Sequence, residues 1–244
     1  MGLFGFLSKD GRDRRNLERN VARAVNKYAQ SPDRYKALQG LIEDGTPEAI
    51  YGALRRFGMV YDKSIEDEQE KEWLFEALVE KGASVIPQVE RYLQSADSIS
   101  WPLRLLGKLA GKEHEVDVLT RILERHEPGY ERDPTKKIQL LNHLADIKDP
   151  RAPALAVPYL VDMDEGVRYA AAEALVRLGN EDVAREALIE HFVADSEESL
   201  RVRLEIARGL VDRGWLIKTH RPAFDKKLPD QFSIDREGRL KKKS

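Results

Sequence analysis

The residues best suited to metal chemistry are two histidine–glutamate pairs. His114-Glu115 and His126-Glu127 offer imidazole and carboxylate groups, which both bind divalent metals. A metal site needs several ligands that converge on one point, whereas these pairs lie 12 residues apart on one predicted helix, residues 113–126. With no cysteine in the chain, thiolate zinc sites are excluded. We therefore predict surface histidines, with no metal and no cofactor. The other histidines are His143, His191 and His220.

Two arginines occupy matching positions near the start of predicted helices. Arg168 follows Asp162 and Asp164, and Arg203 follows Glu197. An arginine beside a carboxylate in a turn can join one structural repeat to the next, although an exposed pair stabilises a fold by only about 0–1 kcal/mol. We expect these arginines to form a structural ladder rather than a catalytic group.

These arginines belong to an internal repeat. Residues 167–179 (VRYAAAEALVRLG) and 202–214 (VRLEIARGLVDRG) share residue types at a spacing of 35, and residues 75–82 and 38–45 fit the same frame. Centring each copy on a leucine gives spacings between 31 and 37 residues, which is typical of stacked helix pairs. The leucine anchors are Leu41, Leu78, Leu109, Leu144, Leu175 and Leu210.

Each period contains two predicted helices. The first holds the leucine anchor and is often followed, four residues after the leucine, by a glycine that suits a left-handed helix cap. These glycines are Gly45, Gly82, Gly179 and Gly214. The second helix follows a short turn and places apolar residues three and four positions apart, the stripe of an amphipathic helix. The predicted second helices span residues 47–57, 84–93, 113–126, 152–161 and 182–193.

The segment 149–193 carries the strongest family resemblance. It reads DPRAPAL at 149–155 and VRYAAAEAL at 167–175, with an acidic turn between them and Gly179 after them. This pattern resembles the HEAT repeat of the phycobilisome-lyase-like type. The resemblance implies an all-α, right-handed superhelix (a HEAT-like solenoid) of about six helix pairs, whose second helices line the concave side. It implies no particular activity, since such repeats serve many functions. Weaker likeness covers residues 66–97 and 199–214.

We predict a non-catalytic scaffold or adaptor that binds another protein. In the geometry that the resemblance implies, a partner meets the second helices, whose charge runs from basic at the N-terminal end to acidic at the C-terminal end. The candidate partner-binding residues are Arg55, Arg56, Gln88, Arg91, Arg121, Arg125, Glu186 and Glu190.

Three enzyme classes with similar repeats fit less well. HEAT-repeat di-iron hydroxylases use four histidine–glutamate pairs at equivalent repeat positions, and this chain has two on one helix. An alkylpurine DNA glycosylase, the main alternative, needs a basic concave face, whereas residues 37–217 carry 23 basic and 35 acidic side chains. Nucleic acid is therefore not the expected partner, and Trp73, Trp101 and Trp215 are expected to pack between repeats. A bilin lyase needs a chromophore pocket, and no residue of this sequence points to one.

Both ends of the chain are basic. Residues 1–36 and 218–244 each carry nine Lys or Arg and four Asp or Glu. We predict an N-terminal apolar segment and basic capping helix over residues 1–30 and a repeat solenoid over 31–217. An irregular basic tail is predicted from 218 onward, although its residues 232–240 also fit a small hairpin.

Four large apolar residues stand near the start of the chain: Leu3, Phe4, Phe6 and Leu7. They can tuck against the first repeat, dock in a partner's groove, or touch a membrane together with the arginines of residues 1–27. The segment lacks the features of a secretory signal, and no apolar run approaches the roughly 20 residues that cross a bilayer. We expect a cytoplasmic protein.

Overall fold

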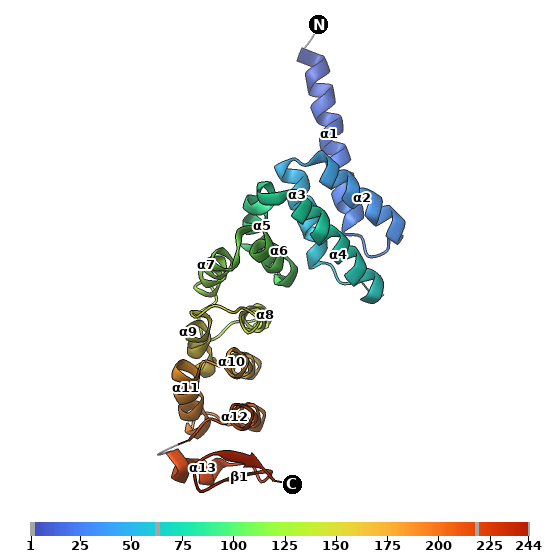
Figure 1. Ribbon diagram of the computed structural model, residues 1–244. Coiled ribbons are helices and arrows are strands. Elements are labelled where there is room, and N and C mark those ends of the chain that lie inside the picture. The colour runs from blue at the N-terminus through green and yellow to red at the C-terminus, as the bar shows by residue number, and fades with distance from the viewer. Residues whose placement is uncertain (1–2, 62–63, 218–219, 244) are drawn as a thin grey trace. The chain divides into compact units, whose positions relative to one another are not determined.

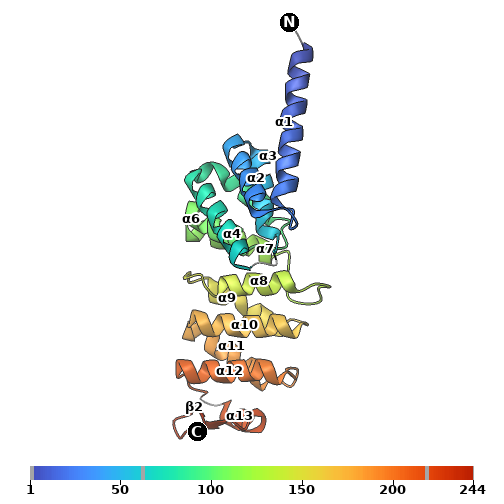
Figure 2. The same cartoon turned by 90° about the vertical axis from the view of Figure 1, so that its right-hand side faces the viewer.

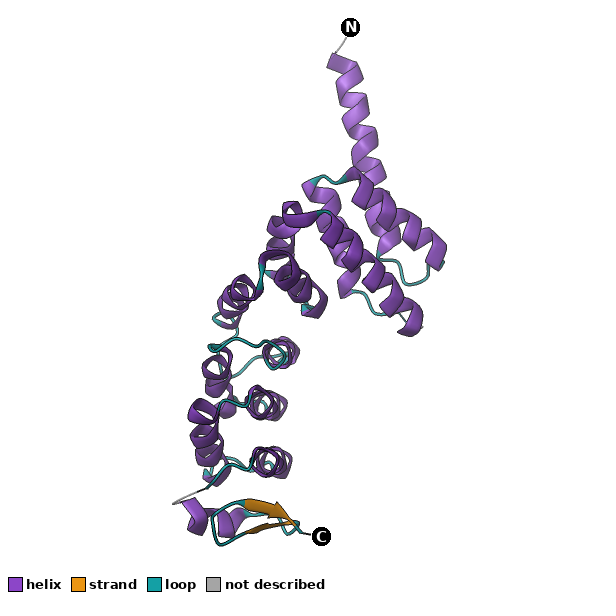
Figure 3. Cartoon of the chain, in the orientation of Figure 1, coloured by secondary structure: helices purple, strands orange, loops and turns teal. Residues whose placement is uncertain are grey.

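The computed structural model describes residues 3–61, 64–217 and 220–243, with side chains from residue 11 onward. The chain is an all-α solenoid of paired helices, and within the described ranges strands are confined to one hairpin near the C-terminus (Figure 3). It divides into two compact units, residues 1–118 and 119–244. The boundary falls inside one helix, α7, and no feature of the repeat pattern predicts it.

Unit 1 contains a leading helix and three first helices, each with its second helix. The leading helix is α1 (Leu3–Ala24), and the first helices are α2 (Ser31–Asp44), α4 (Ser64–Glu80) and α6 (Ser100–Ala110). The second helices are α3 (Pro47–Leu54) continued by the 3-10 turn η1 (Arg55–Gly58), α5 (Ile86–Leu93) preceded by η2 (Gly82–Val85), and the start of α7 (Lys112–Leu123).

Helix α1 packs on α2 and α3 through its C-terminal part. Ala24 is buried, and Val21 lies so close to Gly52 that a Cβ there would sit 2.4 Å from Val21 Cγ2. The apolar segment and the basic helix predicted within residues 1–30 belong to one helix, which begins at Leu3 and ends at Ala24. The side chains of Leu3, Phe4, Phe6 and Leu7 lie outside the described residues.

Unit 2 continues the pattern of paired helices in two layers. Helices α8, α10 and α12 lie side by side, and the second helices form the other layer (Figures 1 and 2). The first helices are α8 (Thr135–Leu144), α10 (Glu165–Leu178) and α12 (Leu200–Arg213). The second helices are α9 (Ala152–Ala156) continued by η3 (Val157–Val161), α11 (Glu181–Val193) and α13 (Arg221–Lys227).

The prediction of an irregular tail after residue 217 is wrong for residues 220–243. Helix α13 packs on α11, where the rings of Phe224 and Phe192 stack with centroids 4.1 Å apart. Strands β1 (Phe232–Ile234) and β2 (Leu240–Lys242) then pair antiparallel, as the hairpin alternative predicted. Phe224, Phe232 and Leu240 are buried, so apolar burial orders this segment despite its basic composition.

Five of the six leucine anchors are buried as predicted. Leu41, Leu78, Leu144, Leu175 and Leu210 are each at most 1% exposed. The glycine caps predicted after first helices adopt left-handed conformations in α2, α10 and α12, with φ between 64° and 69°.

The prediction for Leu109 is wrong, because this leucine is only half-buried. The cap of α6 is Gly111, so the position four residues before the cap belongs to Gly107. A Cβ at Gly107 would lie 2.1 Å from Glu115 Oε2, and this buried carboxylate fills the space that the anchor leucine fills elsewhere. The fully buried leucines near the end of α6 are Leu105 and Leu106 rather than Leu109.

Candidate partner-binding cleft

Unit 1 has a cleft of about 600 Å³ on the side of its second helices. Tyr51 and Arg55 face it from one turn of helix, since residues four apart share a helix face. Tyr92 enters from α5, and Asp97 from the turn that follows α5. The remaining lining residues are Val25, Gly58, Met59, Ser95 and Ala96.

The wall of this cleft is an aromatic pair braced by an arginine. The rings of Tyr51 and Tyr92 meet edge to face with centroids 6.1 Å apart, and the Arg91 guanidinium lies 4.4 Å from the centre of the Tyr51 ring. Such contacts fix the orientation of an aromatic side chain before any partner binds. The wall is therefore preorganised.

Tyr92 is the most strongly shifted titratable group of the cleft. Burial, with smaller contributions from Tyr51 and Asp97, raises the pKa of Tyr92 to about 12, so the phenol stays protonated at neutral pH. Gly58 makes room for the phenol, because a Cβ there would lie 2.9 Å from Tyr92 Oη. The cleft thus presents neutral aromatic surface between an exposed cation, Arg55, and an exposed anion, Asp97.

Two of the predicted partner-binding residues are exposed at or beside this cleft: Arg55 lines it, and Arg91 contacts the Tyr51 ring of its wall. Gln88 lies one turn before Arg91 and is half-buried, and its Oε1 lacks a hydrogen-bond partner among the described residues. The other predicted residues lie in unit 2 and are exposed. Arg121 lies on α7, Arg125 just after α7, and Glu186 and Glu190 on α11.

Arg56 is not a binding residue, contrary to the prediction. Its side chain is fully buried and donates to Glu70 Oε1 and, over 2.6 Å, to Asp67 Oδ1. Arg34 donates to the same Glu70 carboxylate over 3.0 Å, and Lys71 donates to Asp67 over 2.6 Å. We call these five residues the ion cluster of unit 1. Burying a cation without such partners costs several kcal/mol. Arg56 therefore has a structural role inside the ion cluster.

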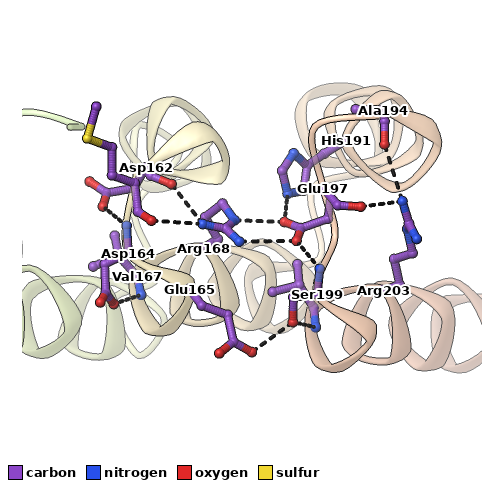
Figure 4. Close-up of polar contacts among 12 residues, drawn as sticks. Asp162, Asp164, Glu165, Val167, Arg168, His191, Ala194, Glu197, Ser199 and Arg203 are labelled. Carbon is purple, nitrogen blue, oxygen red and sulfur yellow. Dashed lines mark hydrogen bonds and ion pairs between the residues drawn. The ribbon is translucent and has the colours of Figure 1, made fainter. Parts of the chain in front are cut away.

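The predicted ladder at Arg168 is confirmed in unit 2 (Figure 4). Arg168 makes two bonds to the Glu197 carboxylate, of 2.7 and 3.1 Å, and donates to the carbonyl oxygens of Asp162 and Met163 in its own turn. Arg203 differs from the prediction, because it donates to backbone carbonyls of its own turn rather than to a carboxylate.

The ladder also sets the charge of its members. Burial opposes ionisation of Glu197, but bonds from Arg168, the Ser199 N–H and His191 outweigh burial and lower the pKa of the carboxyl. His191 Nε2 lies 2.7 Å from Glu197 Oε2, yet burial lowers the pKa of the imidazole. These bonds favour the ionised form of the Glu197 carboxylate.

Sequence reasoning missed one rung of the ladder. Lys137 Nζ donates to Asp162 Oδ2 over 2.9 Å and to the Gly129 carbonyl over 2.8 Å. Lys137 stands seven residues before Leu144, as Arg168 stands seven before Leu175, so its position in the repeat was the available signal.

The histidines take part in separate pairs. The ring nitrogens lie 2.5 Å from the carboxylate for His114 and Glu90, 2.8 Å for His126 and Glu131, and 2.8 Å for His220 and Glu186. Among the residues whose positions are described, no three His, Asp or Glu side chains converge to hold a metal ion.

The tryptophans pack inside the helical layers. Trp73 meets Tyr35 edge to face with centroids 5.4 Å apart, and Trp101 stacks on Phe57 at 5.8 Å. Trp215 is 5% exposed. Trp73 and Trp101 are half-buried in these contacts, and Trp215 is buried.

Comparison with known proteins supports the repeat assignment for part of the chain. Residues 116–210 match the family model of HEAT repeats. No curated protein matches the sequence. One similar solved structure is that of human deoxyhypusine hydroxylase in complex with glycerol, 17% identical, with 94% of this chain and 93% of that chain covered and a TM-score of 0.31. Within the described part of the chain, no helix is long and apolar enough to cross a membrane.

Proposed function

We propose that this protein is a non-catalytic scaffold that binds another protein through the cleft of unit 1. The observation that carries the proposal is the composition of the cleft, which is lined by two tyrosines, a methionine and the exposed Arg55, with the exposed Arg91 on the Tyr51 ring beside it. Tyrosine, methionine and arginine are enriched in protein interfaces, and tyrosine and arginine supply many of their strongest contacts. The HEAT repeats of residues 116–210 agree with such a role, since these repeats commonly mediate protein interaction.

The chemistry of the cleft favours an acidic segment with an apolar or aromatic residue. Arg55 and Arg91 offer fixed positive charge, and an arginine guanidinium pairs with carboxylates in a planar, two-bond geometry. Tyr51 and Met59 add apolar surface to the lining, which an apolar side chain of the partner can contact. Of the nine lining residues, none is histidine or lysine, and the carboxylate is that of Asp97.

We further propose that the repeats are of the phycobilisome-lyase-like type and that the protein works in the cytoplasm. The DPRAPAL and VRYAAAEAL segments within residues 149–175 support the repeat type. Neither proposal affects the binding test, which depends on the cleft alone.

The test compares two variants of the tagged full chain in affinity purification followed by mass spectrometry. Arg55→Glu combined with Arg91→Glu reverses the charge of the cleft, and Lys36→Glu combined with Arg104→Glu reverses two exposed cations on the first helices of the same unit. We expect a protein that is retained by the wild type and by the control variant but lost with the cleft variant. Its affinity for the purified chain should then fall at least about tenfold in calorimetry with the cleft variant.

Two results would overturn the proposal. One is an unchanged partner set with the cleft variant. The other is steep, salt-dependent binding of duplex DNA by the wild type, which is the signature of phosphate contacts and of the glycosylase alternative.

A further inference from the structure

Unit 2 exposes four large apolar side chains at the turns that lead into its first helices. Tyr130, Val161, Met163 and Leu200 are 81, 73, 73 and 60% exposed. Each lies in, or directly beside, a turn that leads into a first helix, and these turns precede α8, α10 and α12. Scattered exposed apolar residues are ordinary, whereas a row of them in equivalent places of stacked repeats marks an interaction surface.

The ladder holds these turns against one another. Lys137 and the Gly129 N–H both bind Asp162, which joins the first turn to the second. Arg168 binds Glu197, and Ser199 Oγ donates to Glu165 over 2.7 Å, which joins the second turn to the third (Figure 4). The ladder therefore fixes the turns that carry the four apolar side chains, and we call these four residues together the apolar edge.

The surroundings of the apolar edge are acidic. The three turns, residues 124–134, 162–164 and 194–199, contain nine Asp or Glu and two Lys or Arg. The ladder neutralises Asp162 and Glu197, but Glu127, Asp133 and Glu198 are exposed in the same turns. Charge complementarity requires an occupant that is both apolar and basic.

The chain itself contains a segment of that chemistry in α1. Residues 9–28 carry seven Lys or Arg and three Asp or Glu. Arg12, Arg14 and Arg15 are exposed on α1, and the C-terminal part of this helix packs on its own unit near Val21 and Ala24. The N-terminal part of the helix also carries Leu3, Phe4, Phe6 and Leu7 in its sequence.

We propose that the apolar edge of one molecule binds helix α1 of a second copy. The contact is an amphipathic helix laid on the apolar edge, with arginines beside carboxylates. The two surfaces differ, so the interface is head-to-tail and leaves one of each free at the ends of an assembly. The cleft of unit 1 takes no part, so this proposal stands or falls independently of the proposed function.

The first experiment measures the mass of the purified full chain by light scattering after size exclusion, over a series of concentrations at moderate salt. We expect the mass to rise above the monomer value of 27.9 kDa with concentration and to fall again at high salt, where exposed charges are screened. Met163→Asp should weaken this association at least about tenfold. The matched control is Val60→Asp in unit 1, which alters an equally exposed valine (78% exposed) and should change nothing.

The second experiment mixes two deficient variants. Met163→Asp keeps α1 intact, and Arg12→Glu combined with Arg15→Glu keeps the apolar edge intact. Each variant should be monomeric alone, and the mixture should form a one-to-one dimer that cannot grow, because only one functional contact remains. Circular dichroism of each variant confirms that it is folded.

Three outcomes would overturn the proposal. The wild type could stay monomeric at every concentration, Met163→Asp could associate as well as the wild type, or the mixed variants could fail to combine. Binding of the monomeric wild type to vesicles of anionic phospholipid, lost with Arg12→Glu and Arg15→Glu, would assign α1 to a membrane surface instead.

Discussion

The two units use the same repeat position in different ways. Seven residues before the anchor leucine stands a buried or half-buried cation: Arg34 and Lys71 in unit 1, Lys137 and Arg168 in unit 2. In unit 2, Lys137 and Arg168 each reach a carboxylate in the next turn, whereas Arg203 at the same position donates to backbone carbonyls. Figure 4 shows the Arg168 rung of this ladder. In unit 1 the carboxylates come from α4, and they draw in a further cation, Arg56, from the second helix η1.

The ladder of unit 2 and the proposed binding cleft of unit 1 lie in different parts of the chain. The ladder lies in the part of the chain that matches HEAT repeats, residues 116–210, and the cleft lies in unit 1. Arg55 and Arg56 are neighbours, yet one is exposed at the cleft and the other is buried in the ion cluster. We infer that irregular pairing in unit 1 leaves its second helices free to form a binding surface.

The largest effect should follow from breaking the ion cluster of unit 1. Glu70→Gln removes the carboxylate that Arg34 and Arg56 share, and both cations then lie buried with incomplete pairing. Breaking a buried ion pair costs about 3–5 kcal/mol. Urea denaturation should show this loss, while Glu72→Gln, at an exposed position of the same helix, should leave the free energy of unfolding unchanged. An equally small effect for both variants would contradict the role of the cluster.

The second prediction compares the loss of stability at a buried anchor leucine with the loss at Leu109. Leu175 is fully buried, so Leu175→Ala should lower the free energy of unfolding by about 2–5 kcal/mol. Leu109 is half-buried, so Leu109→Ala should cost clearly less. Thermal denaturation of the two variants side by side checks the order, and equal losses would restore Leu109 as an anchor.

The ladder should show a smaller, pH-dependent contribution. The pKa of Glu197 is lowered in the folded state, so its stabilisation is present above the pKa of an unfolded carboxyl, about 4.3, and is lost as pH falls through the lower folded value. Glu197→Gln should therefore be less stable than the wild type at neutral pH, by about 1–3 kcal/mol. Denaturation curves at a series of pH values should converge in acid, and a constant gap would contradict the ionised ladder.

The smallest effect on stability should come from the cleft itself. Arg55→Glu alters an exposed side chain and should change the free energy of unfolding by no more than about 0.5 kcal/mol. The same substitution is expected to impair partner binding. A large loss of stability in a denaturation experiment would place Arg55 with the structural arginines and remove the contrast with Arg56.

The fold was largely predictable because its signal is periodic. Leucines at nearly constant spacing, with left-handed glycines at Gly45, Gly179 and Gly214, identified the helix pairs. The repeat frame failed at Leu109. There Gly107 takes the anchor position and the Glu115 carboxylate lies against it, a contact that the spacing of leucines does not reveal.

The candidate site was less predictable from sequence. Helical spacing located Arg55 and Arg91 on the second helices, but it gave neighbouring Arg56 the same role. Its burial depends on Asp67 and Glu70, which approach from another helix. The order of the C-terminal segment likewise depends on contacts of Phe224 with Phe192, which its basic composition concealed.

Site-specific photo-crosslinking tests the central claim most directly. A photoreactive phenylalanine replaces Tyr51 in the cleft of one variant and Lys36 on α2 in another, and both full-length proteins are irradiated in cells. The account predicts that a partner protein is captured from position 51 and not from position 36. Capture from position 36 alone, or equal capture from both, would contradict the assignment of partner binding to the cleft of unit 1.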